Sequence, residues 1–286
     1  IENFRPGTME RFGLDFETVR EDNPGIVYCS ITGFGRGEGA ALPGYDPLVQ
    51  ALSGLMSVTG PPDGEASKVG VALVDVIAGL NASHGILAAL RVRDATGEGQ
   101  RVEIDLLSTA LSALANQASS YLNTGVAPSR LGNVHPSIEP FSTYAAADGP
   151  MMICAGNDRH FASLAQVLGV PELAGDERYS SNGSRVENRE ALRAEIEVQL
   201  AERPVADWVE DLSFAGVPAG PVNDIEGGFA LAESLGLDVV DEIDGIRIPA
   251  SPIKLSEDPP ETRVAPPELD GQGEMLRAWL AGPDLS

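Results

Sequence analysis

The sequence predicts an α/β fold made of a large domain with a smaller α+β domain inserted into it. Short β-branched runs alternate with apolar helical segments at the front of the chain, which favours α/β. Two stretches rich in glycine and proline, 124–129 and 216–222, then interrupt the pattern. The expected parts follow in chain order: 1–125 as the first part of the large domain, 126–140 as a linker, 141–220 as the small domain and 221–286 as the return to the large domain.

The front of the chain shows helices and strands in turn. Residues 9–21 have helical spacing and end at the turn signal Asn23-Pro24-Gly25. The following segments are, in order, a buried strand at 26–31, a glycine-rich loop at 33–39, a helix at 46–56, a long apolar helix within 68–94, a short strand at 100–104 and an apolar helix at 106–122.

The remainder of the chain begins with a hairpin. Two apolar runs, 141–145 and 151–155, flank Asp148-Gly149, which is typical of a tight turn between antiparallel strands. The later segments are helices at 158–168, 187–202, 205–214 and 226–235, a strand pair within 239–248 and a proline-rich acidic tail at 258–267 that we expect to lie on the surface.

Composition excludes several classes of protein. The 286 residues include 43 acidic and 19 basic side chains, giving a formal charge of −24, so phosphate backbones and anionic membranes repel the chain. Two cysteines, Cys29 and Cys154, cannot staple a chain of this length, and their apolar surroundings predict buried thiols in strands. No signal pattern opens the sequence, and no apolar run reaches roughly 18 residues. We expect a cytoplasmic protein that binds neither nucleic acid nor membrane.

Common catalytic patterns are weak or missing. Gly35 to Ala40 fits G-x-G-x-x-A, but Leu42-Pro43-Gly44 follows in place of a helix, which favours a surface loop over a dinucleotide site. No G-x-S-x-G is present, and no histidine has the spacing of a metal ligand, so we expect no metal. His84 lies in an apolar helix and is expected in the core, whereas a functional role for His135 remains open.

Asp75 is the most informative residue. It lies in the apolar run Val-Ala-Leu-Val-Asp-Val-Ile-Ala-Gly-Leu, and burying a carboxylate costs several kcal/mol unless it is paired or hydrogen-bonded. In one reading it is the N-cap of the long helix and accepts backbone N–H bonds. In the other it is a nucleophilic carboxylate at a helix N-terminus. The residues alone favour the first reading, and both can hold together.

Several blocks, in the same order, resemble the class III CoA-transferase family over nearly the whole chain. These blocks are Glu-Asn-Phe-Arg-Pro-Gly at 2–7, Gly-Tyr-Asp-Pro-Leu-Val-Gln at 44–50, Lys-Val-Gly-Val-Ala-Leu-Val-Asp at 68–75, Thr-Gly-Glu-Gly-Gln at 96–100, Arg-Leu-Gly-Asn-Val-His-Pro at 130–136, Pro-Ala-Gly-Pro-Val at 218–222 and Ser-Pro-Ile-Lys-Leu-Ser at 251–256. The resemblance implies an acyl-CoA:carboxylate CoA-transferase, with coenzyme A entering as the acyl-CoA substrate and a carboxylic acid as acceptor.

The resemblance also implies roles for individual residues. Asp75 falls at the catalytic aspartate of the family, which forms a mixed anhydride and then an aspartyl-CoA thioester. Tyr45 and Asp46 align with a Tyr-Glu pair beside that carboxylate. Four further residues align with positions that line the CoA site: Asn3, Phe4, Arg11 and Phe12.

Two alternatives remain open. The family contains 2-methylacyl-CoA racemases, whose histidine aligns with Tyr45; a tyrosine, with an ordinary pKa of about 10, is a poor base there. The chain can also be a non-catalytic CoA-binding or assembly subunit. This alternative rests on the front of the family's Rossmann-like large domain, which we expect to be missing before Ile1.

The implied assembly is an interlocked homodimer. Because CoA is polyanionic and this chain is acidic, the few cations near the front are expected to meet its phosphates. These cations are Arg5, Arg11 and Lys68.

Overall fold

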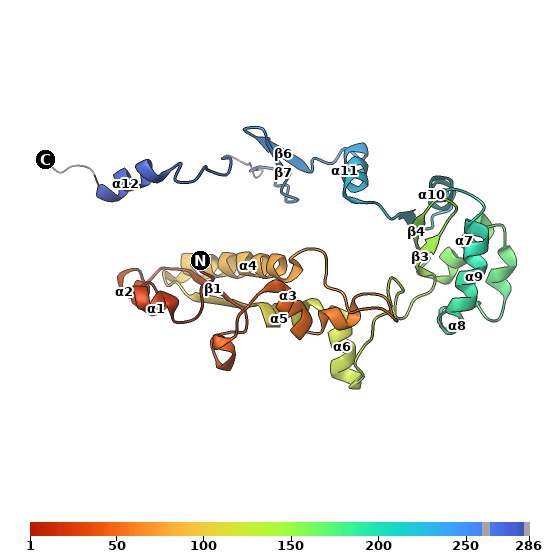
Figure 1. The fold of residues 1–286 in the computed structure, drawn as a ribbon, viewed down its shortest axis with the longest axis horizontal. Coiled ribbons are helices and arrows are strands. Elements are labelled where there is room, and N and C mark those ends of the chain that lie inside the picture. Colours follow the sequence, from red (N-terminus) through yellow and green to blue (C-terminus); the bar gives the residue numbers. More distant parts are fainter. Residues whose placement is uncertain (259–263, 283–286) are drawn as a thin grey trace. The chain divides into compact units, whose positions relative to one another are not determined.

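The computed structural model describes residues 1–258 and 264–282. The chain divides into two compact units, Ile1–Ala219 and Gly220–Ser286, and each is considered by itself. The expected mixed α/β character is confirmed, with helices and small sheets along the chain (Figure 1). The larger Rossmann-like sheet, the missing front segment and the domain boundaries at 125, 140 and 220 stay predictions.

A pair of parallel strands organises the first 125 residues. β1 (Tyr28–Thr32) pairs with β2 (Arg101–Asp105) over their full lengths. The long helix α4 (Leu73–Thr96) connects towards β2 and packs against both strands. The approach is close at Gly85, where an added Cβ would lie 2.6 Å from Cγ1 of Val102. Both strands and the predicted long helix therefore form, and α4 begins later than the apolar run suggested.

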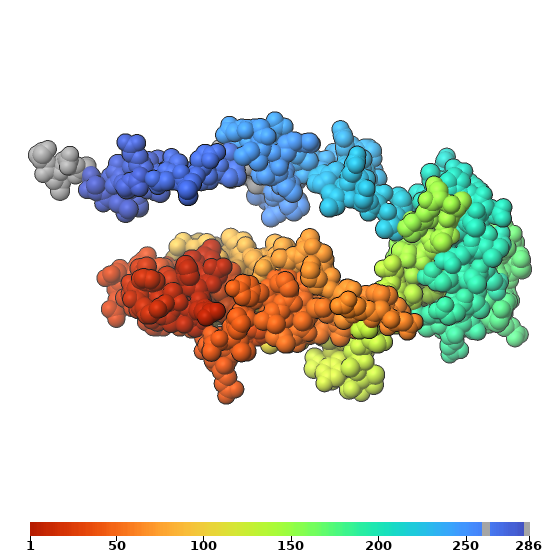
Figure 2. All heavy atoms as spheres, in the orientation of Figure 1, coloured from red at the N-terminus to blue at the C-terminus, as the bar shows by residue number. Residues whose placement is uncertain are grey.

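The other elements of this region are short helices. They are α1 (Thr8–Phe12), α2 (Phe16–Asp22), η1 (Glu38–Ala41), α3 (Asp46–Leu52), η2 (Leu55–Val58), α5 (Leu106–Ala113) and α6 (Ala115–Thr124). Two helices predicted as continuous are broken. Gly13, at a φ of 63°, ends α1, and Ala115, at a φ of 44°, separates α5 from α6. α6 contains no buried residue and stands out from its neighbours in Figure 2.

The core of this region is small. It contains five buried side chains from α3, α4 and α5: Val49, Val74, Ala78, Leu106 and Ala110. The outward face of α4 is apolar and exposed, as at Leu80 and Leu87. His84 is exposed on α4, so its expected place in the core is wrong: the apolar run did not reveal which side of the helix is covered.

Helix α4 is long and apolar enough to cross a membrane by length and composition alone, with a mean hydropathy of 1.6 over its best window. Core helices of soluble proteins pass the same test, and α4 packs against the two strands and α5. The helix is thus weak support for a membrane span, and the expected absence of membrane binding stays a prediction.

Residues 141–217 surround a second, larger core. β3 (Phe141–Ala145) and β4 (Pro150–Cys154) form the predicted hairpin. The helices packed on it are α7 (Asp158–Val167), η3 (Pro171–Gly175), α8 (Asn182–Glu187), α9 (Arg189–Leu200) and α10 (Val205–Phe214). Buried apolar side chains from these elements form one cluster that includes Tyr144, Ile153, Leu192 and Trp208. β5 (Ala219–Pro221) falls in a stretch predicted as a linker.

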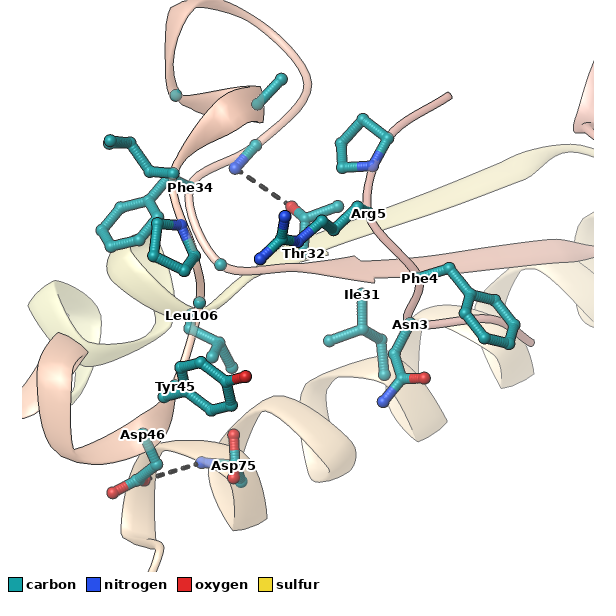
Figure 3. A pocket seen from close by; sticks show the side chains of 18 residues that line it. Asn3, Phe4, Arg5, Ile31, Thr32, Phe34, Tyr45, Asp46, Asp75 and Leu106 are labelled. Carbon is teal, nitrogen blue, oxygen red and sulfur yellow. Dashed lines mark hydrogen bonds between the residues drawn. The ribbon is translucent and has the colours of Figure 1, made fainter. Parts of the chain in front are cut away.

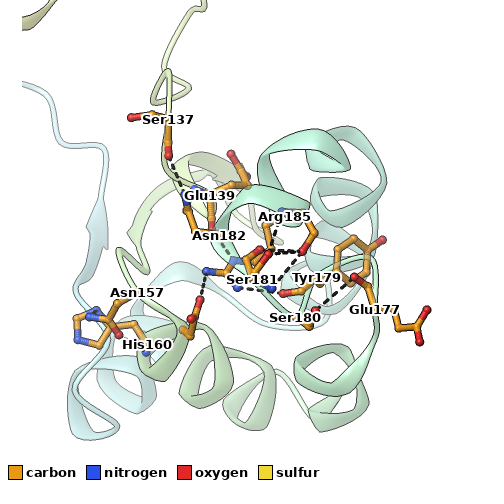
Figure 4. Close-up of polar contacts among 12 residues, drawn as sticks. Ser137, Glu139, Asn157, His160, Glu177, Tyr179, Ser180, Ser181, Asn182 and Arg185 are labelled. Atoms are coloured by element: carbon orange, nitrogen blue, oxygen red, sulfur yellow. Dashed lines mark hydrogen bonds and ion pairs between the residues drawn. The ribbon is translucent and has the colours of Figure 1, made fainter.

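A buried arginine ties the segment before β3 to α7 and α8. The Arg185 side chain is fully buried and donates to the carbonyls of Glu139 and Tyr179, at 2.7 and 2.9 Å, and to Asp158, at 2.7 Å (Figure 4). The carboxylate of Glu139 is also buried and accepts the Tyr144 hydroxyl at 2.7 Å. Desolvation raises the pKa of Glu139 above its ordinary value.

The two thiols lie in strands as expected, but only Cys29 is buried, and Cys154, the last residue of β4, is partly exposed. The unit from Gly220 contains α11 (Ile225–Ser234), a hairpin of β6 (Val240–Ile243) and β7 (Ile246–Pro249), and α12 (Gly273–Ala281). None of its described hydrophobic side chains is buried. Of the predicted surface tail at 258–267, residues 259–263 lie outside the described residues.

Candidate active site

A pocket of about 390 Å³ opens at the carboxyl ends of the parallel strands (Figure 3). Ile31, Thr32 and Gly33, at the end of β1, and Leu106, directly after β2, form one wall. Ligands of α/β proteins bind at this edge of a sheet, because the loops that follow the strands meet there. The pocket also lies beside the first turn of α4, which contributes Asp75.

The first residues of the chain reach the pocket by pairing with β1. Glu2 forms a parallel bridge to Ser30. The N–H of Glu2 donates to the carbonyl of Cys29, and its carbonyl accepts the N–H of Ile31, both at 2.9 Å. The three residues that follow, Asn3, Phe4 and Arg5, therefore emerge at the carboxyl end of β1 and line the pocket.

The opposite wall depends on two glycines whose backbones touch. An added Cβ on Gly33 would collide with Cα of Gly44, and an added Cβ on Gly44 would collide with Cα of Gly33. No side chain fits at either position without moving the backbone. This contact brings the end of β1 against the segment before α3, so that Tyr45 and Asp46 come next to Asp75 (Figure 3).

Asp75 is not the N-cap of α4. The cap residue is Ala72, which has no side chain to offer, and Asp75 is the third residue of the helix. The carboxylate of Asp46 takes the capping role instead, with Oδ2 accepting the N–H of Val74 at 2.8 Å and that of Asp75 at 3.2 Å. The expectation of a capping Asp75 is thus wrong, because a residue 29 positions earlier satisfies the free donors of the helix.

The electrostatics of the two carboxylates differ. Asp46 is 4% exposed and accepts from Gln50 Nε2 at 2.6 Å as well as from the two backbone groups. Asp75 faces the pocket and accepts no hydrogen bond from the described residues. Desolvation raises the pKa of Asp75 above its ordinary value, and the negative charge of Asp46 raises it further. The Asp75 side chain is exposed and not buried as its apolar surroundings suggested, and it faces the pocket, where it can attack a bound thioester.

Five of the seven residues assigned from the sequence lie around this pocket: Asn3, Phe4, Tyr45, Asp46 and Asp75. In Figure 3 the Tyr45 hydroxyl is directed over Asp75. Arg11 and Phe12 lie on α1 and are not among the lining residues; the Phe12 side chain is 68% exposed. Their expected contact with CoA stays a prediction.

Arg5 is the single cationic side chain among the described residues that line the pocket. It is directed into the pocket on the side opposite Asp75 (Figure 3). Lys68, the other cation expected to meet CoA phosphates, is exposed and donates to the carbonyl of Val69. Gln50, which holds Asp46, was missed by sequence reasoning, since nothing near it in the sequence indicates a buried polar contact.

The expected absence of a metal stays a prediction. Residues 1–258 and 264–282 contain no group of three or more His, Cys, Asp or Glu side chains that could hold a metal ion, and none of their histidines lines the pocket. His135, whose role was open, accepts the N–H of Ser137 at Nδ1 and packs its ring against Phe141, so it supports the turn before β3.

The sequence profile of CoA-transferase family III matches residues 1–273. The chain belongs to this family. The resemblance seen in the sequence blocks and the expected enzyme class, a CoA-transferase, are thereby confirmed.

The relatives share most of the chain. It is 40% identical over 286 residues to the acetyl-CoA:oxalate CoA-transferase of Acetobacter aceti, covering 99% of this chain and 74% of that protein. It is 41% identical over 284 residues to the succinate–glutarate CoA-transferase of Agrobacterium fabrum, covering 96% of this chain and 71% of that one. Among solved structures, a CaiB/BaiF family protein from Brucella suis superposes with a TM-score of 0.87 at 39% identity, covering 98% of this chain and 74% of the other.

Proposed function

We propose that the chain transfers CoA from an acyl-CoA to a carboxylate acceptor, with Asp75 as the nucleophile. The observation that supports this most directly is the position of Asp75: its carboxylate faces a pocket at the sheet edge, free of hydrogen bonds from the described residues, with a raised pKa. The family and the names of the relatives support the transferase reaction.

The reaction needs no net proton transfer. A carboxylate oxygen of Asp75 attacks the thioester carbonyl, the C–S bond breaks, and CoA leaves as thiolate from a mixed anhydride. The thiolate attacks the aspartyl carbonyl, which breaks the C–O bond, releases the donor acid as a carboxylate and leaves an aspartyl-CoA thioester. The acceptor carboxylate attacks this thioester and releases the thiolate again, which attacks the acceptor acyl carbon and regenerates Asp75.

Polar and apolar side chains around Asp75 have different roles in this scheme. The Tyr45 hydroxyl, directed over the carboxylate, donates to the oxygen that becomes negative during attack (Figure 3). The apolar side chains of Ile31 and Leu106 line the pocket and reduce the access of water to the anhydride and thioester, which would otherwise be hydrolysed.

We further propose that the acceptor is a small dicarboxylate. Oxalate, succinate and glutarate appear in the names of the relatives. Arg5 supplies one cation in the pocket, which suits a second carboxylate at a distance from the reacting one. Within this proposal, Arg5 selects the acid and the other front cations are left for the CoA phosphates.

The racemase alternative lacks a second base. Proton exchange at the α-carbon needs two groups that take and give protons. Among the described lining residues, the ionisable partners of Asp75 are Arg5, Tyr45 and Asp46, and Asp46 has both oxygens engaged. The pocket therefore favours the transferase.

The test is chemical trapping. Purified protein incubated with acyl-CoA and hydroxylamine should acquire a hydroxamate at Asp75, which peptide mass spectrometry locates. Asp75→Asn should form no adduct and transfer no CoA. Exchange of solvent deuterium into the α-carbon without an acceptor acid would instead support the racemase, and binding of CoA without any adduct would support a non-catalytic subunit.

A further inference from the structure

The amide of Gln50 joins the two segments that carry the active-site carboxylates. Gln50 is on α3, one turn after Asp46, and its side chain is fully buried. Its Nε2 donates to Oδ1 of Asp46 at 2.6 Å and to the carbonyl of Val71 at 3.4 Å. Its Oε1 accepts the N–H of Val69 at 2.8 Å. One side chain thus contacts both Asp46 and the segment that leads into α4.

These bonds form a continuous path to Asp75. Gln50 fixes one oxygen of Asp46, and the other oxygen binds the N–H groups of Val74 and Asp75. The cap residue of α4 offers no side chain of its own, so the orientation of the first turn depends on this path. None of the bonds reaches the Asp75 carboxylate, which stays available in the pocket.

We infer that Gln50 is a positioning residue for the transferase reaction: acting through Asp46, it aligns the first turn of α4 so that the Asp75 carboxylate meets the thioester. The inference rests on the proposed role of Asp75 as nucleophile. Gln50 does not line the pocket and is expected to change the rate of acylation more than the binding of acyl-CoA.

The chemistry of the contact explains why an amide is required. The group beside Asp46 must donate, and the group beside the N–H of Val69 must accept, so the two ends of the amide cannot be exchanged. A methionine of similar length offers neither bond. A glutamate offers both only while it is protonated, because an ionised carboxylate would meet Asp46 in a buried site.

Other charges around this amide are few. Asp75 lies beyond Asp46, Tyr45 precedes Asp46 on the chain, and the Lys68 ammonium donates to the carbonyl of Val69 at 3.3 Å. A new ionisable group at position 50 would therefore respond mainly to the negative charges of Asp46 and Asp75.

The experiment compares Gln50→Met with wild type, using rapid-quench measurement of Asp75 acylation and steady-state kinetics. We expect kcat and the acylation rate to fall about 10- to 100-fold, since small misplacements of a reacting group cost up to about 10²-fold, while KM for acyl-CoA changes less than about threefold. Ser53→Ala is the control: Ser53 is buried directly after α3, and its hydroxyl donates to the backbone carbonyl of Gln50 and not to the side-chain amide, so the variant should keep wild-type rates.

A second variant, Gln50→Glu, covers the case in which Gln50→Met does not fold. Its kcat should approach that of wild type at low pH, where the introduced carboxyl group would be protonated, and fall as pH rises, whereas wild-type kcat rises with pH to a plateau. An unchanged pH profile in Gln50→Glu, or an unchanged acylation rate in Gln50→Met, would overturn the role of Gln50 but leave the proposed function of Asp75 intact. Failure of the wild type to form any Asp75 adduct would overturn the proposed function and this inference with it.

Discussion

Replacement of Asp46 by alanine is predicted to loosen the start of α4. The change removes three hydrogen bonds, those to Val74 N, Asp75 N and Gln50 Nε2. Losing a helix cap costs about 0.5–2 kcal/mol, and leaving the N–H of buried Val74 without a partner costs about 1–3 kcal/mol. Removal of a buried charge offsets part of this, so we expect a net loss of about 2 kcal/mol.

The assay is thermal unfolding followed by circular dichroism, together with amide hydrogen exchange. For a chain of this size, a loss of about 2 kcal/mol corresponds to a decrease in Tm of about 4–8 °C. Amide protection at Val74 and Asp75 should decrease most. Asp46→Asn keeps an acceptor oxygen and should lose less than half as much. If Asp46→Ala unfolds at the wild-type temperature and both amides stay protected, Asp46 does not cap α4.

Three further predictions concern charge. Attack needs ionised Asp75, so activity should be lost as pH falls through its raised pKa; Asp46→Asn removes the neighbouring charge and should move this acid limb of the kcat profile to lower pH. Arg5→Gln should raise KM for a dicarboxylate acceptor about 10-fold or more without a matching change in KM for a monocarboxylate. An equal rise in KM for both acceptors, or a rise in KM for acyl-CoA alone, would contradict the proposed selectivity. The pKa of Glu139 is raised in the folded state, so its contribution to stability is fully present below the ordinary pKa and is lost as pH rises through the raised pKa. Glu139→Gln can still accept the Tyr144 hydroxyl, so in urea unfolding its free energy of unfolding should increase relative to wild type as pH rises. A constant difference between the two proteins at all pH values would contradict this.

The sequence predicted local features well where a strong pattern exists. The β-branched run before Gly33, the Asp148-Gly149 turn and the long apolar run around Asp75 all form the expected elements. Asp75 could be singled out because it is a lone carboxylate in an apolar run, although its side chain is exposed and not buried.

The failures have different physical origins. The cap of α4 comes from Asp46, 28 and 29 residues before the two N–H groups that it binds, and Gln50 accepts the N–H of Val69, 19 residues later. The break at Ala115 carries no glycine or proline signal. His84 is exposed on α4, and the apolar residues of this helix show no clear periodicity that would indicate which face is covered.

The role of Asp75 as nucleophile is tested by identifying the residue that receives the acyl group. Protein quenched during turnover with acyl-CoA and hydroxylamine is digested, and the modified peptide is sequenced by mass spectrometry. We predict a hydroxamate at Asp75 that requires acyl-CoA and disappears in Asp75→Asn. CoA transfer at wild-type rates in Asp75→Asn, or an adduct on a different side chain, would contradict it.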